Sequence, residues 1–456
     1  MTNTTSKTLF QLCYPLFINA FLSLAVTLID TMLISNYADA AAAAVSIANQ
    51  VLGVAYDLSG LLAVGAVILV SRALGQGDEA QARAIATVTI LANAALSLLI
   101  ALALVPLGPL LVKLINTPPE IVANAVLYIH VIAVAMVFNG FLMAAVAVLR
   151  AFGRVKTILL LGVFANVLYI IAEYVLIYGY GPVPELGVFG SALATLLVRV
   201  IGVLLLLWVL IRHLKLSDHM PLRDVSFLKP LLKRLFNLSY PSVLDNVAYG
   251  FYQLTLVSFI AGLGVATVLS RSYTLALTAF LTLIVMTISQ GTEVLVGYRY
   301  GEGRGRATWQ RGVHSTALAI LFATVVSIVF YLFSGTLIGL FTQDPDIHRL
   351  AKALLLLTIF LQPVTALNTI LFHALKVVGD VYVPVVISQA IMWGLGLPLA
   401  YYLCIPMEMG VIGLWYVFIL EEGLKGALMW YRWSRGRWRD ELERQSAGEP
   451  NVFQSC

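Results

Sequence analysis

The chain has 456 residues, of which 60% are hydrophobic and only 11% are charged. Soluble globular domains carry about 25% charged residues, so this composition excludes an ordinary soluble protein and indicates a chain built mainly of membrane-spanning segments. The formal net charge is only +5. Cys13, Cys404 and Cys456 are scattered in or beside apolar segments, so they suggest neither a disulfide framework nor a metal motif.

The first apolar run, residues 10–35, is long enough to cross a hydrocarbon core of about 30 Å as one helix. It is too long for a signal-peptide core and has no small-residue cleavage site, so we expect it to remain as a helix. Pro15 removes a backbone donor and is expected to bend this helix near its start. Asp30 places a carboxyl inside the run, where a charge costs at least about 2.5–3.5 kcal/mol. An intramembrane acid predicts a proton or ion site; the alternative is that Asp30 reaches interfacial water near the helix end.

Further apolar runs follow as far as residue 433 and predict an all-α integral membrane protein with twelve transmembrane helices. The expected spans are roughly 10–34, 43–70, 86–112, 121–149, 157–179, 187–211, 238–263, 265–297, 313–340, 350–375, 382–404 and 411–432.

Basic residues are distributed very unevenly over the two sides of these spans. With a cytoplasmic amino terminus, twenty-two of the 28 Lys and Arg residues lie in inner segments, three in outer segments and three within spans. The positive-inside rule then predicts a multi-pass protein of the cell inner (plasma) membrane with both termini cytoplasmic. The excess of Lys and Arg over acidic residues is therefore explained by the orientation of the chain in the membrane, and no nucleic-acid partner is expected.

Four short motifs return in the second half of the chain in the same order. The first three recur at one common offset and the last at a slightly shorter one: Tyr14-Pro15 as Tyr240-Pro241, Gly75-x-Gly77 as Gly301-x-Gly303, Leu149-Arg150-x-x-Gly153 as Leu375-Lys376-x-x-Gly379, and Gly187-Val-Phe-Gly190 as Gly410-Val-Ile-Gly413. This order predicts an internal duplication with an amino-terminal lobe (1–212), a cytoplasmic linker (213–237), a carboxy-terminal lobe (238–433) and a cytoplasmic tail (434–456).

Each lobe has six spans, so both lobes start on the same side and form parallel repeats, as in one class of secondary transporter. The expected consequence is a cavity between the lobes that opens alternately to each face. Neither Gly75-x-Gly77 nor Gly301-x-Gly303 follows a predicted strand, and the chain contains no G-x-x-x-x-G-K-[ST] motif, so no phosphate-binding loop is predicted. Transport is therefore expected to use an ion gradient rather than ATP bound by this chain.

From about residue 8 to residue 433 the sequence resembles the multidrug and toxic compound extrusion (MATE) family, within the larger group that includes polysaccharide and lipid-linked flippases. The resemblance is carried by three stretches: Pro15 to Ile29-Asp30-Thr31 followed by Ala48-Asn49-Gln50, then Val70-Ser71-Arg72-Ala73-Leu74-Gly75-Gln76-Gly77-Asp78, then Leu149-Arg150-Ala151-Phe152-Gly153. It implies the MATE fold and an antiporter that expels amphipathic, often cationic, compounds against an inward flow of H⁺ or Na⁺.

The resemblance also implies an ion-coupling site in the first lobe. Asp30 matches the first-span acid, while the fifth-span positions that the family fills with Asn and an acid hold Tyr169 and Glu173 here. Asp30 and Glu173 precede the outer ends of two ascending helices by about four and six residues, so their depths differ by only about 3 Å. Two carboxyls close together in an apolar site cannot both ionise easily, which suits a proton carrier. Because the Asn is replaced by a phenol, we favour H⁺ over Na⁺.

Three further polar residues of this lobe leave alternatives open. Thr195 matches a family hydroxyl that lines the lobe, and Asn139 is a further polar candidate, although each could simply pack between helices. Arg199 falls in the middle of the sixth span, where an unpaired guanidinium is expensive. If Arg199 pairs with Glu173, that acid is held ionised and its role is structural.

The second lobe lacks the acids that many family members carry there. Tyr249 occupies the seventh-span position that often holds an acid, and Asp245 lies one turn earlier. Asp245 could substitute for that acid or only form local bonds near the kink expected at Pro241. The candidates for the substrate cavity are Asp245, Tyr249, Tyr252, Gln362 and His373, although a lone His there more often packs.

Other charged residues in these spans are expected to be structural. Arg271 near the end of the eighth span is expected to extend to the interface. Glu421 and Lys425 are spaced i, i+4 and are expected to pair with one another. The sequence suggests no partner for Glu422.

The sequence thus predicts a non-enzymatic, monomeric multidrug or organic-compound exporter, driven by cation antiport with H⁺ favoured over Na⁺ and with no cofactor. The expected substrates are small amphipathic compounds that are cationic or aromatic. A dedicated exporter of one metabolite, peptide or siderophore is the first alternative. A flippase for a lipid-linked precursor is the second, against which stands the small number of arginines within spans.

Overall fold

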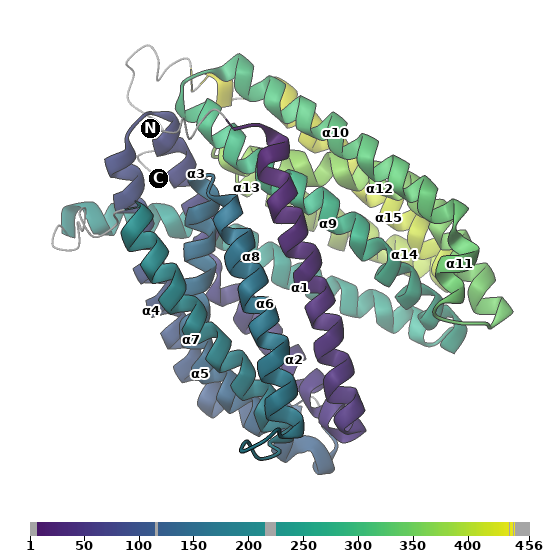
Figure 1. Cartoon of the computed structure of the whole chain (residues 1–456). Helices are drawn as coiled ribbons and strands as arrows, with labels where there is room; N and C mark the ends of the chain where they lie inside the picture. The colour runs from purple at the N-terminus through teal and green to yellow at the C-terminus, as the bar shows by residue number, and fades with distance from the viewer. Residues whose placement is uncertain (1–6, 115–116, 215–224, 437, 441, 443–456) are drawn as a thin grey trace. The chain divides into compact units, whose positions relative to one another are not determined.

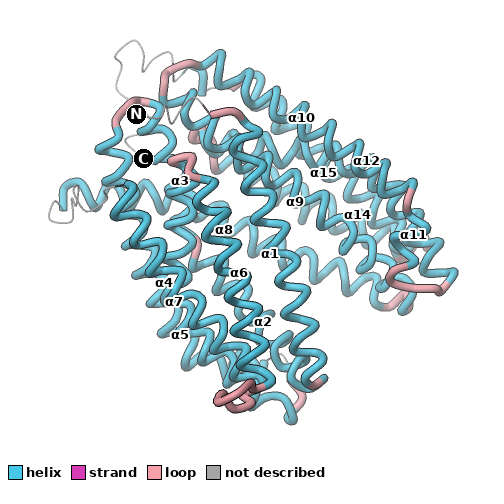
Figure 2. The backbone as a smooth tube through the Cα atoms, viewed as in Figure 1, coloured by secondary structure: helices cyan, strands magenta, loops and turns pink. Residues whose placement is uncertain are grey.

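The computed structural model describes residues 7–114, 117–214, 225–436, 438–440 and 442 of the chain (Figure 1). Almost all of these residues are helical, and the loops between the helices are short (Figure 2). In chain order the helices are α1 (Leu9–Tyr37), α2 (Asp39–Ser59), α3 (Leu61–Gly75), α4 (Glu79–Leu114), α5 (Pro119–Ala151), α6 (Val155–Tyr178), α7 (Gly187–Leu214), α8 (Val225–Ala261), α9 (Val265–Gly301), α10 (Gly305–Leu332), α11 (Ser334–Gly339), α12 (Pro345–Val377), α13 (Tyr382–Ile391), the π-helical turn η3 (Met392–Gly396), α14 (Leu397–Cys404) and α15 (Gly410–Arg435).

Each of the twelve expected spans is occupied by one helix or by helices that follow one another directly. Among the described residues, ten helical segments are long and apolar enough to cross a membrane. The other two spans, α8 and α15, are as long but contain more polar residues. Of the expected linker, residues 215–224 lie outside the described part, and α8 already begins at Val225. Residues 443–456 of the expected tail also lie outside it.

The described residues form two compact units. One unit comprises residues 14–243, and the other comprises residues 7–13 together with those from 244 onward. The chain passes from one unit to the other within α1 and within α8, close to Pro15 and Pro241. A proline inside a helix removes one backbone hydrogen bond and bends the axis, so the repeated Tyr-Pro pair marks both crossing points.

The repeated glycines end helices in the same way in both halves. Gly77, Gly153, Gly303 and Gly379 all have φ between +66° and +95°, a conformation that favours glycine. After each of α3, α5, α9 and α12, the glycine N–H bonds a carbonyl three residues back and the next N–H bonds one five residues back. This is the Schellman pattern of helix termination. The same cap at the repeated positions of both halves agrees with the duplication expected from the sequence.

One helix lies at the centre of each unit. In the first unit α5 packs on α2, α3, α4 and α7, and in the second α12 packs on α9, α10 and α15 (Figure 1). α5 presents small buried residues to its neighbours, and Gly140 allows backbone approach, because a Cβ there would lie 2.5 Å from the Asn93 carbonyl oxygen. Small residues at helix interfaces are typical of membrane proteins, where close packing replaces the hydrophobic effect.

The break between α2 and α3 is compensated by a buried side chain from α4. The helices are interrupted at Gly60, which leaves backbone groups of the second span without helical partners. Asn93 is fully buried; its Oδ1 accepts from the Leu62 N–H at 3.0 Å and its Nδ2 donates to the Ser59 carbonyl at 2.7 Å. A second bond from Nδ2, to the Gly140 carbonyl at 2.7 Å, joins α5 to the same point.

Candidate functional site

A cluster of polar side chains in the first unit lies between α1 and α6. Tyr169 and Glu173 are one turn apart on α6, and Asp30 projects from α1. The Tyr169 hydroxyl lies 3.0 Å from Asp30 Oδ1 and 3.3 Å from Glu173 Oε1. A phenol has one hydrogen, so it can donate to only one of these carboxyls at a time. The second contact becomes a hydrogen bond only if a carboxyl is itself protonated and donates to the phenol oxygen.

Glu173 is completely buried, whereas Asp30 is half-buried. Glu173 Oε1 also accepts from the Ser191 hydroxyl at 3.2 Å, while its Oε2 has no hydrogen-bond partner among the described residues. The carboxyls of Glu173 and Asp30 lie close enough to share a hydrogen bond. An ionised pair at this separation and burial would repel strongly, so the geometry suits two carboxyls that hold one proton between them.

Of the other predicted residues in this lobe, Thr195 lies beside the cluster and Asn139 does not. The Thr195 hydroxyl donates to the Ser191 carbonyl at 3.3 Å and lies within hydrogen-bonding range of Tyr169. Asn139 donates to the Ser59 hydroxyl at 2.6 Å and so belongs to the α2–α3 break.

Arg199 does not pair with Glu173. In the described part of the chain Arg199 forms no ion pair; its Nη2 donates to the Tyr56 hydroxyl at 3.0 Å, and the guanidinium lies 5.0 Å from the centre of the Tyr56 ring. The face of the ring supplies negative potential to the cation. Sequence reasoning had no signal for Tyr56, because helix neighbours in space are not spaced regularly in the chain.

In the second unit, Asp245 and Tyr249 lie on α8 and each contacts an amide side chain. Asp245 Oδ1 accepts from Gln389 Nε2 at 2.6 Å. Tyr249, 48% exposed, accepts from Gln253 at 2.8 Å, and Gln253 in turn accepts from Arg271 Nη2 at 2.9 Å. Arg271 thus joins α9 to these α8 residues.

The other three predicted cavity residues have different surroundings, and Tyr252 is linked to the Asp245 contact through Trp393 and Gln389. Tyr252 is fully buried, and its hydroxyl donates to Glu421 Oε2 at 2.6 Å. Gln362 is buried, and its Oε1 has no partner among the described residues. His373 Nδ1 lies 2.8 Å from the Thr369 carbonyl one turn earlier on α12.

A buried charged triad on α15 was only partly expected. The predicted pair of Glu421 and Lys425 is present, with both side chains 3% exposed. Lys425 Nζ also lies 3.2 Å from Glu422 Oε1, and Asn368 Nδ2 on α12 donates to Glu422 Oε2 at 2.9 Å. The i, i+4 spacing could reveal the first pair, but nothing in the sequence links Asn368 to Glu422.

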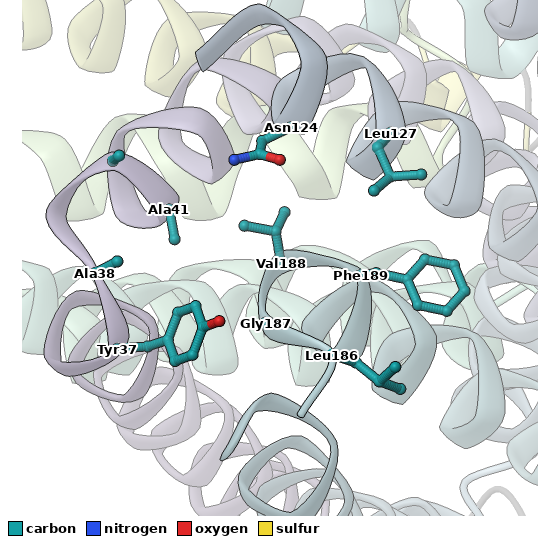
Figure 3. A pocket seen from close by; sticks show the side chains of 10 residues that line it. Tyr37, Ala38, Ala41, Asn124, Leu127, Leu186, Gly187, Val188 and Phe189 are labelled. Carbon is teal, nitrogen blue, oxygen red and sulfur yellow. The ribbon is translucent and has the colours of Figure 1, made fainter. Parts of the chain in front are cut away.

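A pocket of about 220 Å³ lies elsewhere in the first unit, where α1 ends and α7 begins (Figure 3). It is lined by Tyr37, Ala38, Ala40, Ala41, Asn124, Leu127, Leu186, Gly187, Val188 and Phe189. The Tyr37 hydroxyl donates to Glu185 at 2.8 Å beside it. None of the predicted ion-coupling residues lines this pocket.

Comparison with known proteins agrees with the duplicated fold. The MatE family model matches twice, over residues 15–175 and 241–402, so the two matches begin at the two prolines of the repeated Tyr-Pro pair. The uncharacterized transporter YisQ of Bacillus subtilis is 32% identical over 431 residues, 94% of each chain. The probable multidrug resistance protein NorM of Thermotoga maritima is 26% identical and covers 95% of this chain and 93% of its own.

Solved structures show the same fold at low identity. A multidrug resistance MATE family transporter of the MOP superfamily, in an outward-facing conformation, has a TM-score of 0.86 and 20% identity over 96% of each chain. The Vibrio cholerae MATE transporter VcmN in its bent form has a TM-score of 0.87 and 19% identity, covering 99% of this chain and 100% of that one. The twofold match of the family model and the YisQ alignment together show that this chain belongs to the MatE family of membrane transporters.

Proposed function

We propose that this chain exports small organic compounds by secondary antiport and that H⁺, bound at Asp30, Glu173 and Tyr169, is the coupling ion. Export is supported by family membership and by relatives named as a probable multidrug resistance protein and as the multidrug export protein MepA of Staphylococcus aureus. The observation that carries the choice of ion is the single Tyr169 hydroxyl between two carboxyls.

The preference for a proton follows from counting hydrogens. Tyr169 and Ser191 each bring one hydroxyl hydrogen to this cluster, and Asp30 and Glu173 together offer four acceptor oxygens. One added proton lets Glu173 donate to Tyr169 while Tyr169 donates to Asp30. The protonated cluster then carries one negative charge rather than two, which lowers the cost of its burial in the membrane.

The transport cycle that we propose uses this change in charge. With the amino terminus cytoplasmic, Asp30 lies toward the outer end of α1, and its half-buried carboxyl gives protons from outside a route to Glu173. Protonation biases the transporter toward one conformation and releases the bound compound outward. Deprotonation toward the inside resets the site, so that inward H⁺ flow drives export by alternating access of the two lobes.

The proposed substrates are amphipathic compounds that carry a positive charge or an aromatic ring. Asp245 supplies a carboxyl in the second unit, and the nearby Tyr249 exposes nearly half of its surface for stacking or cation–π contact. A dedicated exporter of one metabolite shares this mechanism and differs only in the range of compounds moved.

Transport of an organic-cation dye in proteoliposomes tests this proposal. We expect an imposed pH gradient to drive dye movement in the wild type and Asp30→Asn to abolish it, because an amide cannot pass a proton on to Glu173. Asp39→Asn, the same change at an exposed acid at the start of α2, is the matched control and should retain transport. Movement driven by a Na⁺ gradient alone would overturn the choice of ion. Full activity of Asp30→Asn would remove the carboxyl pair from the mechanism.

A further inference from the structure

The charged triad on α15 carries more negative than positive charge. Glu421 and Glu422 share one ammonium, Lys425, on α15, the last of the twelve expected spans. A net negative charge buried at this depth is expensive unless a further positive charge approaches it. The two carboxylates are not equivalent, since Glu422 is 18% exposed and Glu421 only 3%.

Glu421 is enclosed by its neighbours. It receives hydrogen bonds from Lys425 and from the Tyr252 hydroxyl. The π-helical turn η3 brings Gly396 against the pair, so that a Cβ there would lie 2.6 Å from Tyr252 Oη and 2.8 Å from Glu421 Oε2. Glu421 therefore keeps Lys425 in place and has no free side for a ligand.

Glu422 is open by comparison. Lys425 reaches its Oε1 at 3.2 Å, a longer contact than the one to Glu421, and Asn368 Nδ2 donates to its Oε2. That bond fixes the orientation of the Asn368 amide and leaves its Oδ1, a buried atom, without a hydrogen-bond partner among the described residues. An ionised carboxylate beside an unused carbonyl acceptor is a site for a cation that can donate N–H bonds.

Glu422 also lies within electrostatic range of Asp245 and Tyr249, the two α8 residues that the sequence marks as cavity candidates. The positive charges of Lys425 and Lys376 also act on the Asp245 carboxyl. A cation at Glu422 would thus have the exposed Tyr249 ring and a second carboxyl nearby.

We propose that Glu422 and Asn368 bind the protonated amine of the transported compound, with Lys425 remaining on Glu421. The carboxylate supplies charge, and Asn368 Oδ1 accepts an N–H. This arrangement distinguishes primary and secondary ammonium groups from quaternary ones, which have no hydrogen to donate. The inference rests on the proposed function, since it names the substrate group that the second lobe recognises.

Fluorescence titration of the purified full chain in detergent tests the inference without requiring transport. The probes are two dansyl amides that differ only at the end of a propyl arm, one with a primary ammonium and the other with a trimethylammonium. We expect the wild type to prefer the primary ammonium about fivefold, as one additional hydrogen bond would allow. Glu422→Gln should weaken both probes at least about tenfold, because charge is lost.

Asn368→Leu should weaken the primary ammonium probe about fivefold and change the trimethylammonium probe less than about twofold. Glu120→Gln, on an exposed acid at the start of α5, is the matched control and should change neither. Unchanged affinities in folded Glu422→Gln, or equal losses for both probes in Asn368→Leu, would overturn the inference. Competition by Na⁺ that disappears in Glu422→Gln would also overturn it, in favour of an inorganic cation site.

Failure of the proposed function would look different. Binding that follows the expected pattern, without proton-driven movement in proteoliposomes, would reject H⁺ antiport while leaving the amine site intact. Proton-driven transport of the dye with unaltered binding in both variants would reject only the amine site.

Discussion

Replacement of Tyr169 by Phe removes the one hydroxyl between Asp30 and Glu173 and leaves the ring in place. This hydroxyl lies 3.0 Å from one carboxyl and 3.3 Å from the other, and it can donate a hydrogen bond to only one of them at any time. A hydrogen bond to a charged group contributes a net 1.5–3 kcal/mol, so proton-driven transport should fall by about 10- to 100-fold. The fall is expected because the ring that remains has no donor for either carboxyl.

The assay compares initial rates of dye uptake in proteoliposomes under the same imposed pH gradient. Tyr174→Phe is the matched control, since Tyr174 lies on the same helix, is 52% exposed and makes no hydrogen bond through its hydroxyl in the described structure. Dye binding in detergent should be unchanged in both variants, which separates a coupling defect from a folding defect.

Wild-type rates in Tyr169→Phe would refute the idea that this hydroxyl links the two carboxyls during the cycle. An equal loss of dye uptake in Tyr174→Phe would show that uptake falls after any change on α6, whether or not the hydroxyl contacts the carboxyls. A loss of dye binding together with transport would place Tyr169 in substrate recognition rather than in coupling.

Three further predictions concern stability, measured as thermal unfolding of the purified protein in detergent. Gly396→Ala should destabilise by about 1–3 kcal/mol, because its methyl group would meet the Tyr252–Glu421 contact, whereas Gly394→Ala, with no atom within 4 Å, should not. Asn93→Ala should cost about 2–4 kcal/mol, since three buried hydrogen bonds at the α2–α3 break are removed together. Lys425→Met should cost about 3–5 kcal/mol by leaving buried carboxylates unpaired, and Glu421→Gln added to it should recover part of this loss.

Each of these has a contrary outcome. Equal melting temperatures for the two glycine variants would show that η3 adapts without strain. An unaffected Asn93→Ala would mean that other groups satisfy the broken helix. A double variant no more stable than Lys425→Met would indicate that charge is not what Lys425 contributes.

Much of the architecture can be predicted by summing hydropathy along the chain. The mean hydropathy of about twenty residues locates a span and does not depend on which helices pack against it. All twelve expected spans are therefore occupied by helices close to the expected positions. The repeated motifs likewise agree with the two halves matched by the family model, which begin at Pro15 and Pro241. The family resemblance pointed to Asp30 and Glu173 as partners, and their similar depths along two helices supported that expectation.

Side-chain partners depend instead on which helices are neighbours and on how each is rotated about its axis. Arg199 contacts Tyr56 rather than Glu173 for this reason, and Asn139 joins the α2–α3 break rather than the carboxyl pair. The hydrogen bond between Asn368 on α12 and Glu422 on α15 could not be predicted from the spacing of these residues in the chain. The sequence by itself thus determined the membrane class, the spans and the duplication, and its resemblance to the family pointed to the acid pair. Only tertiary structure decided which polar groups meet, because a rotation of one helix by one residue, about 100°, turns a side chain away from its partner without changing any hydropathy sum.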